Sequence, residues 1–133
     1  MFQQAIQGGN RGGGNGLTYT ELLSSPFDAI GTYNLNDDIS NYNAIIVTMI
    51  TVYQGKEIGN KTLFLPKPLL DNMSRVQYEF IVDETAIVDN NVNICLGYVH
   101  FSFPTNTSIR ADLMGHNTGF RSAVKIKSVI GVN

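Results

Sequence analysis

The sequence predicts an all-β protein: an antiparallel β-sandwich, jelly-roll-like, with a flexible Gly-rich N-terminal arm. Three observations support this prediction. About eight or nine strand-like segments follow one another at roughly ten-residue spacing, bounded by turn residues. No segment sustains the 3.6-residue period of an amphipathic helix. Charged residues make up only 15% of the chain, and Asn, Thr, Ser and Gly take their place, as is common in turn-rich β proteins.

The chain divides into an N-terminal arm and one domain. Residues 1–16 hold six of the 13 glycines. Glycine loses the most conformational freedom on folding, so this stretch is predicted to be a linker or an arm that orders only against a partner. A phosphate-binding loop is disfavoured, because Asn15 rather than Lys follows Gly9–Gly14 and no strand precedes it. Residues 17–133 are enough to build a single core.

The central element is Asn41–Tyr53, the longest apolar run. Its β-branched residues favour a strand over the alternative of a buried helix, because they lose rotamer freedom in helices. Alternate positions are apolar on both faces, so we expect a strand that is covered on both sides. One face holds Ile45, Val47, Met49, Thr51 and Tyr53, and the other holds Ala44, Ile46, Thr48, Ile50 and Val52.

Two short strands and a polar corner precede this element. Residues 17–23 and 30–35 are predicted strands, separated by a turn at 24–27 in which Pro26 stops any ladder. The corner at 36–41 contains two aspartates beside asparagines, which suggests calcium as an alternative. It lacks the ligand spacing and the closing Glu of an EF-hand, so a capped turn is favoured.

The segments after Tyr53 are predicted from turn residues and alternation. Up to residue 73 they are a turn at 54–56, a short piece at 57–58, a turn at 59–60, a strand at 62–65 and a helical turn at 69–73. From residue 75 they are strands at 75–82, 86–88, 92–103, 109–114 and 120–132, turns at 89–91 and 115–119, and a loop at 104–108. Pro66 and Pro68 end their strand because proline cannot donate to a ladder.

No catalytic, cofactor-binding or metal-binding residue is predicted. Cys95 is the only cysteine, which excludes an internal disulfide, and its apolar surroundings predict a buried core residue. His100 is expected to be a core or interface residue, and neither it nor His116 lies in a catalytic motif. One cysteine and two scattered histidines do not make a zinc site. A pair of carboxylates that meets only in the fold stays open.

Charge and hydropathy limit the partners. The net charge of −2 provides no broad basic field, so no nucleic acid is expected. No apolar run is long enough to span a bilayer and the start of the chain shows no secretory signal, so no membrane insertion is expected. The absence of Trp weakens an ordinary sugar-stacking site, although six tyrosines remain as candidates: Tyr19, Tyr33, Tyr42, Tyr53, Tyr78 and Tyr98.

Two stretches resemble the C-terminal β-sandwich domain of phage tail fibres and related virion appendages. In LLSSPFDAIGTYNLNDDISNYNAIIV (Leu22–Val47), a small-residue turn is followed by a polar corner, Ser40–Asn43, and an apolar strand. Asn43 stands where such domains often have Asp. KIKSVIGVN (Lys125–Asn133) resembles their closing strand. The chain departs from a full tail fibre, because it contains no long shaft, coiled coil or repeat.

The resemblance implies a homotrimeric β-sandwich in the virion, used for host-surface attachment. The leading hypothesis is a non-enzymatic head-fibre, decoration or tail-tip/fibre component, bound to other virion proteins through its N-terminal arm, with a host-surface glycan as a weaker secondary ligand. The alternative is a stand-alone carbohydrate-binding module, which predicts a monomer with exposed tyrosines. A third hypothesis, a small jelly-roll hydrolase, predicts paired carboxylates in a pocket.

Overall fold

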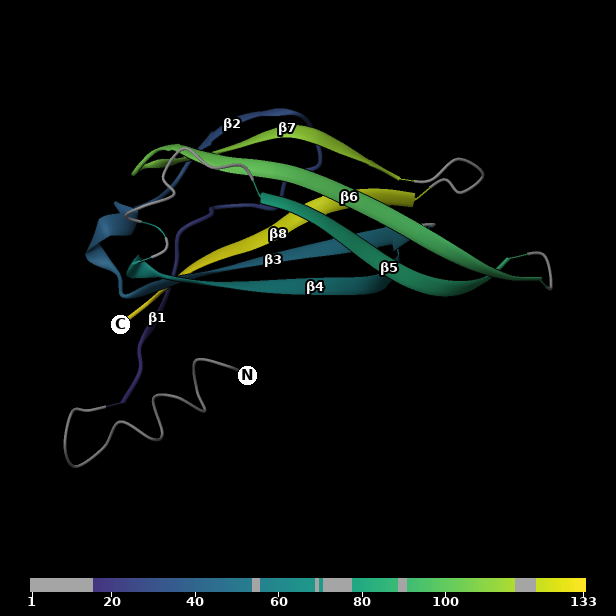
Figure 1. Cartoon of the computed structure of the whole chain (residues 1–133), viewed down its shortest axis with the longest axis horizontal. Coiled ribbons are helices and arrows are strands. Elements are labelled where there is room, and N and C mark those ends of the chain that lie inside the picture. The colour runs from purple at the N-terminus through teal and green to yellow at the C-terminus, as the bar shows by residue number, and fades with distance from the viewer. Residues whose placement is uncertain (1–15, 54–55, 69, 71–77, 89–90, 117–121) are drawn as a thin grey trace.

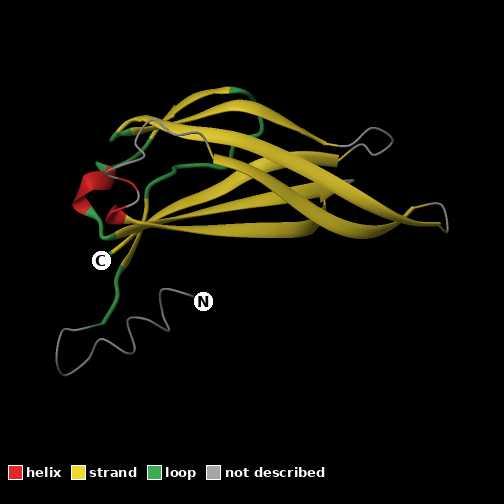
Figure 2. Ribbon diagram, in the orientation of Figure 1, coloured by secondary structure: helices red, strands yellow, loops and turns green. Residues whose placement is uncertain are grey.

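The computed structural model describes residues 16–53, 56–68, 70, 78–88, 91–116 and 122–133, and it is an all-β sandwich. Two antiparallel four-stranded sheets face each other (Figures 1 and 2). The first, called here the β3 sheet, has the order β1 (Tyr19–Glu21), β8 (Ser122–Val132), β3 (Ala44–Tyr53), β4 (Lys56–Pro66). The second, the β6 sheet, has the order β2 (Gly31–Asn34), β7 (Ser108–His116), β6 (Asn91–Thr105), β5 (Tyr78–Val88). The predicted fold class is therefore confirmed.

The connections are of two kinds. The pairs β3–β4, β5–β6 and β6–β7 are consecutive antiparallel neighbours within one sheet. The chain changes sheet between β1 and β2, β2 and β3, β4 and β5, and β7 and β8. The described strands number eight, within the predicted count, but their order does not confirm the jelly-roll detail, which stays a prediction.

Three predicted breaks in strands are wrong. β4 runs unbroken through Gly59 and Asn60, because the long β3 offers partners along its whole length and a bulge opposite Thr51 and Val52 absorbs Ile58. β5 likewise continues to Val88, so residues 86–88 are not a separate piece. β6 extends through Pro104 to Thr105, with irregular register there, and the turn is confined to residues 106–107.

Some predicted elements lie mainly outside the described residues. These are most of the arm (1–15), the start of the strand at 75–82, and the turns at 54–56, 89–91 and 115–119. The predicted helical turn at 69–73 is also largely outside. Of its residues only 70 is described, and it is helical, as are residues 67 and 68 just before the predicted turn. The strand predicted at 109–114 extends at both ends, to Ser108 and His116.

The hydrophobic core lies between the sheets. Ile45, Val47 and Met49 on the inner face of β3 are fully buried, and they face a layer that includes Phe101 and Ile109 from the β6 sheet. The outer face of β3 is only partly covered: Ala44 and Ile50 are buried, whereas Ile46, Thr48 and Val52 are half-buried. The expected double cover of this strand is thus complete on one face within the chain and incomplete on the other.

The polar corner before β3 folds as a capped turn, as predicted. It contains the 3-10 helix η1 (Ile39–Asn41), whose N-cap, Asp38, accepts hydrogen bonds from the backbone N–H and hydroxyl of Ser40 at 2.8 and 2.5 Å. Asp37 accepts from the Tyr42 hydroxyl at 2.8 Å, from the Asp38 N–H at 2.8 Å and from the Asn41 side chain at 3.1 Å. Side-chain hydrogen bonds thus replace regular secondary structure here.

The corner is attached to the last strand through Tyr42 and Gly131. The Tyr42 ring lies so close to Gly131 that an added Cβ would be 2.4 Å from its Cδ1 atom. Asn43 donates its N–H to the Val132 carbonyl at 2.9 Å and to the Asn133 side chain at 3.1 Å. Asn133 also donates its side-chain amide to the Asn41 carbonyl at 3.2 Å. A glycine is required at position 131 because the aromatic ring fills the space that any side chain needs.

Candidate functional site

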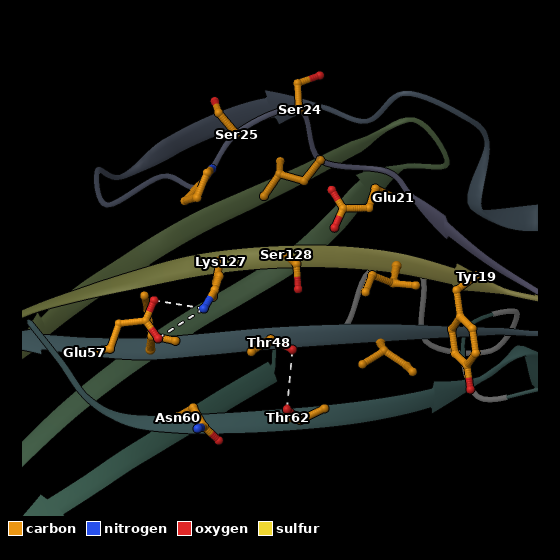
Figure 3. A pocket seen from close by; sticks show the side chains of 15 residues that line it. Tyr19, Glu21, Ser24, Ser25, Thr48, Glu57, Asn60, Thr62, Lys127 and Ser128 are labelled. Carbon is orange, nitrogen blue, oxygen red and sulfur yellow. Dashed lines mark hydrogen bonds and ion pairs between the residues drawn. The ribbon is translucent and has the colours of Figure 1, made fainter. Parts of the chain in front are cut away.

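An open groove of about 840 Å³ lies on the outer face of the β3 sheet (Figure 3). It is distinct from the core, because its floor comes from the strand positions that point away from the β6 sheet. Its lining residues are Tyr19, Glu21, Leu23, Ser24, Ser25, Pro26, Ile46, Thr48, Ile50, Glu57, Asn60, Thr62, Lys127, Ser128 and Ile130. All four strands of the sheet and the segment after β1 contribute side chains.

Strand alternation and one bulge place these side chains. Side chains alternate between the two faces of a strand, so the outward positions Ile46, Thr48 and Ile50 line the groove while their neighbours enter the core. In β8 the register shifts: Thr48 pairs with Ser128, and Met49 pairs with Ile126. Lys127 is therefore the extra residue of a bulge, and both it and Ser128 line the groove.

The floor is organised in cross-strand rows of different chemistry. One row is apolar, with Ile130 of β8 and Ile46 of β3 in the groove. Phe64, the partner of Ile46 on β4, continues this row beyond the groove lining. The next row consists of hydroxyls, Ser128, Thr48 and Thr62, and the Thr48 and Thr62 oxygens are 3.4 Å apart. Paired side chains on one face of a sheet are close enough to present a continuous surface. A ligand in the groove thus meets apolar and hydroxyl-bearing strips side by side.

The two ends of the groove differ. Tyr19 lies at one end, with its ring against the sheet, and an ion pair lies at the other (Figure 3). The Lys127 Nζ atom is 2.9 and 3.1 Å from the two carboxylate oxygens of Glu57, and both side chains are about half exposed. Glu21 adds a second carboxylate, so the described lining residues carry one positive and two negative charges.

The outer face of the β6 sheet is different. Its described outward residues include Thr32, Arg110 and Asp112, and the Arg110 guanidinium lies 2.7 Å from the Asp112 carboxylate. Single ion pairs of this kind on an exposed face contribute little stability. Among the residues whose side chains the structure describes, which leave out β5 and most of β6, this face has no apolar row like that of Ile130, Ile46 and Phe64.

The residues singled out by their chemistry do not meet in a site. His100 is half-buried and lies between two core residues of β6, and its expected role as a core or interface residue stays a prediction. The side chains of Cys95 and His116 lie outside the described ones. No three described His, Cys, Asp or Glu side chains gather in a way that suits a metal ion. In the described part of the chain, no helix is long and apolar enough to cross a membrane.

The tyrosines are distributed between core and groove. Tyr19 lines the groove, whereas Tyr33 stacks on Phe27 with ring centroids 3.7 Å apart. Tyr42 is buried at the corner. The side chains of the other three candidates, Tyr53, Tyr78 and Tyr98, lie outside the described ones.

Electrostatics at the corner support a structural role. The hydrogen bond from Tyr42, together with those from Asp38 and Asn41, lowers the pKa of the Asp37 carboxyl below its ordinary value. Burial first, and then the bond to Asp37, raise the pKa of the Tyr42 hydroxyl. Both shifts favour the charge states in which Tyr42 donates to an ionised Asp37. The pair therefore helps to hold the corner.

The groove was not predicted from the sequence. Its signal was present in Thr48, a hydroxyl within the apolar β3, and in Ser128, which interrupts the alternation of β8. Which of the two apolar faces of β3 stays open depends on where the second sheet packs, and a single strand does not encode that.

A scan against protein-family models finds no match for this chain, and a search of curated proteins finds no significant match.

Proposed function

We propose that this chain is a non-enzymatic phage virion structural protein, a head-fibre, decoration or tail-tip component that is displayed for host-surface attachment. The observation that carries the proposal is the position of the two stretches that resemble virion-appendage domains. They lie far apart in sequence, yet residues 44–47 at the end of the first stretch pair with residues 129–132 of the second, and Tyr42 of the first stretch fits against Gly131 of the second. The two resembling stretches thus meet in one sheet, which supports the proposal.

The proposed assembly is a homotrimer bound to other virion proteins through residues 1–16. Exposed apolar side chains outside the groove lining support association. Phe64 on the edge strand β4 is 58% exposed. Ile30 and Leu17 are also exposed large apolar side chains, and apolar surface of this kind marks contact sites when it is contiguous. The arm leads directly into β1, which is the other edge strand of the same sheet.

Light scattering tests the assembly. Intact protein is expected to have three times the 14.6 kDa mass of the chain. A version without residues 1–16 is expected to have three times the mass of its own shorter chain, because the body carries the contacts. If the intact and the shortened protein are both monomeric, the proposed assembly is wrong. A trimer that requires the arm would place the assembly contacts in residues 1–16.

The alternative, a stand-alone carbohydrate-binding module, is favoured by the groove itself, since Tyr19 and a row of hydroxyls suit a sugar. It predicts a monomer that binds a glycan. The hydrolase hypothesis has less support: of the two groove carboxylates, Glu57 has both oxygens on Lys127, although Glu21 and Glu57 line one groove. Release of reducing ends from a bound glycan would revive it.

A further inference from the structure

We infer that the groove on the outer face of the β3 sheet binds a neutral glycan chain, and that it is the surface by which the protein attaches to its host. The inference rests on the proposed function in this respect: host attachment needs a recognition surface, and the proposal did not locate one. It also adds a ligand class.

A peptide strand does not suit this surface. Peptides that extend a sheet bind through main-chain hydrogen bonds at an edge. The middle of the groove floor is formed by β8 and β3. Both strands have neighbours on either side, β1 and β3 for β8, and β8 and β4 for β3. Their backbone groups are used within the ladder. Only side chains are available to a ligand on this face.

A polyanion does not suit it either. Lys127 is the only cation among the described lining residues, and its ammonium already contacts both oxygens of Glu57. With Glu21 the lining carries one excess negative charge. A nucleic acid, a sialylated glycan or a phosphate-bearing polymer would be repelled, because recognition of such polymers depends on several basic groups.

A purely apolar partner leaves too many polar groups to be desolvated. Thr48, Thr62 and Ser128 form a hydroxyl row, and Asn60, Ser24 and Ser25 also line the groove. Each hydroxyl has one donor and two acceptor positions, so the single 3.4 Å contact between Thr48 and Thr62 leaves most of this capacity unused in the row. Covering such groups with an apolar surface is unfavourable unless each one finds a new partner.

A neutral sugar chain matches both strips. Pyranose rings have an apolar C–H face and a rim of hydroxyls. The apolar Ile130 and Ile46 row and the ring of Tyr19 suit the C–H face, while the adjacent Ser128, Thr48 and Thr62 row suits the rim. The groove crosses several strands and is open to solvent, so it suits an extended chain. One open groove binds weakly, and a trimer with three grooves would multiply the apparent affinity by roughly 10²–10⁴.

The test is native affinity electrophoresis of the full chain in gels that contain a neutral β-glucan, dextran or a neutral galactan. Hyaluronate and heparin serve as polyanionic controls. At least one neutral polymer is expected to retard the protein, and the polyanions are expected not to. Retardation by polyanions alone, or by no polymer in the set, overturns the inference.

Variants locate the binding. Thr48→Arg places a long cation in the middle of the groove and is expected to weaken retardation at least tenfold. The milder double variant Thr48→Ala with Thr62→Ala removes two hydroxyls without added bulk and is expected to weaken it as well. The matched control is Thr107→Arg, an exposed threonine in the turn between β6 and β7, which is expected to bind like the unchanged protein. Equal loss in the control, or none in the groove variants, overturns the inference.

Light scattering of the same variants separates this inference from the proposed function. A trimer that binds none of the neutral polymers leaves the virion proposal standing and the groove inference wrong. A monomer whose binding depends on Thr48 supports the neutral glycan as the ligand of the groove. It contradicts the trimer and favours the stand-alone carbohydrate-binding module. If Thr48→Arg converts a trimer into monomers, the groove is a contact between copies of the chain, and the glycan inference is wrong.

Discussion

Ile45 and Ile46 are neighbours in β3, have the same side chain and lie in opposite environments. Ile45 is completely buried in the core, whereas Ile46 is half-buried in the groove floor. The same contrast runs along the strand, with Val47 and Met49 inside and Thr48 outside. Position 46 differs from position 45 only in the face of the sheet on which it lies. One strand therefore supplies folding energy from one face and part of the floor of an open groove from the other.

The sharpest test of this contrast is the pair Ile45→Ala and Ile46→Ala. Ile45→Ala should lower the free energy of unfolding by about 4 kcal/mol, because it leaves a cavity in a fully packed core. Ile46→Ala should lower it by about 1 kcal/mol, because the side chain is already partly in water. Urea denaturation at matched protein concentration measures both. Equal losses would mean that the outer face is also buried, as in a contact between copies.

The second test concerns the contact between the corner and the last strand. Gly131→Ala should lower the free energy of unfolding by about 3 kcal/mol, since the new methyl group overlaps the Tyr42 ring. Tyr42→Ala should relieve this overlap, so the double variant should cost less than the sum of the two single changes. Additive losses, measured by urea denaturation, would show that the ring and the glycine do not interact.

The third test is a pH dependence. The pKa of Asp37 lies below its ordinary value of 3.8 in the folded chain. The ionised carboxylate therefore contributes to the free energy of unfolding above about pH 4, and this contribution is lost as pH falls through the folded pKa. Tyr42→Phe removes the main cause of this shift. The urea midpoint of the variant should be lower than that of the unchanged protein at pH 6, and the difference should shrink towards pH 3.

The titration of Tyr42 at high pH should change the stability in the opposite direction: stability is lost as pH rises. The pKa of Tyr42 is raised above 10.0, so its contribution is complete below pH 10 and is lost as pH rises through the folded value. Tyr42→Phe should remove this loss. Asp37→Asn is the control, because it keeps the ring in place and removes the carboxylate. The urea midpoints of the unchanged protein, Tyr42→Phe and Asp37→Asn are compared above pH 10. If all three fall in parallel as pH rises, Tyr42 is not the group that titrates.

The smallest effect is expected inside the core. Thr51 is fully buried on the inner face of β3, and its hydroxyl is the one buried side-chain polar atom without a hydrogen-bond partner among the described residues. Thr51→Val keeps the shape and removes the unpaired hydroxyl, so it should raise the free energy of unfolding by up to about 1 kcal/mol. Thr48→Val, its counterpart in the groove, should change the stability less. If Thr51→Val instead lowers the free energy of unfolding, the Thr51 hydroxyl has a hydrogen-bond partner in the folded protein.

Much of the fold follows from local patterns. The β-branched run of β3 predicted a strand, and the aspartates at positions 37 and 38 predicted the capped corner that Asp38 indeed forms. The breaks predicted at Gly59, at residues 83–85 and at Pro104 failed, because local turn propensity was outweighed by the hydrogen bonds of a continuous ladder with β3 or β6. Residues with low strand propensity remain in a strand at such points when a long partner strand pairs with them.

The sequence by itself determined the class of fold and the apolar character of both faces of β3, because these depend on alternation, composition and turn residues. Only the tertiary structure decided which face enters the core and which stays open. It also brought Tyr42 against Gly131 and placed Ser128 beside Thr48 through the bulge at Lys127. The physical reason is that register and sheet packing arise from contacts between residues distant in sequence, and no local pattern records them.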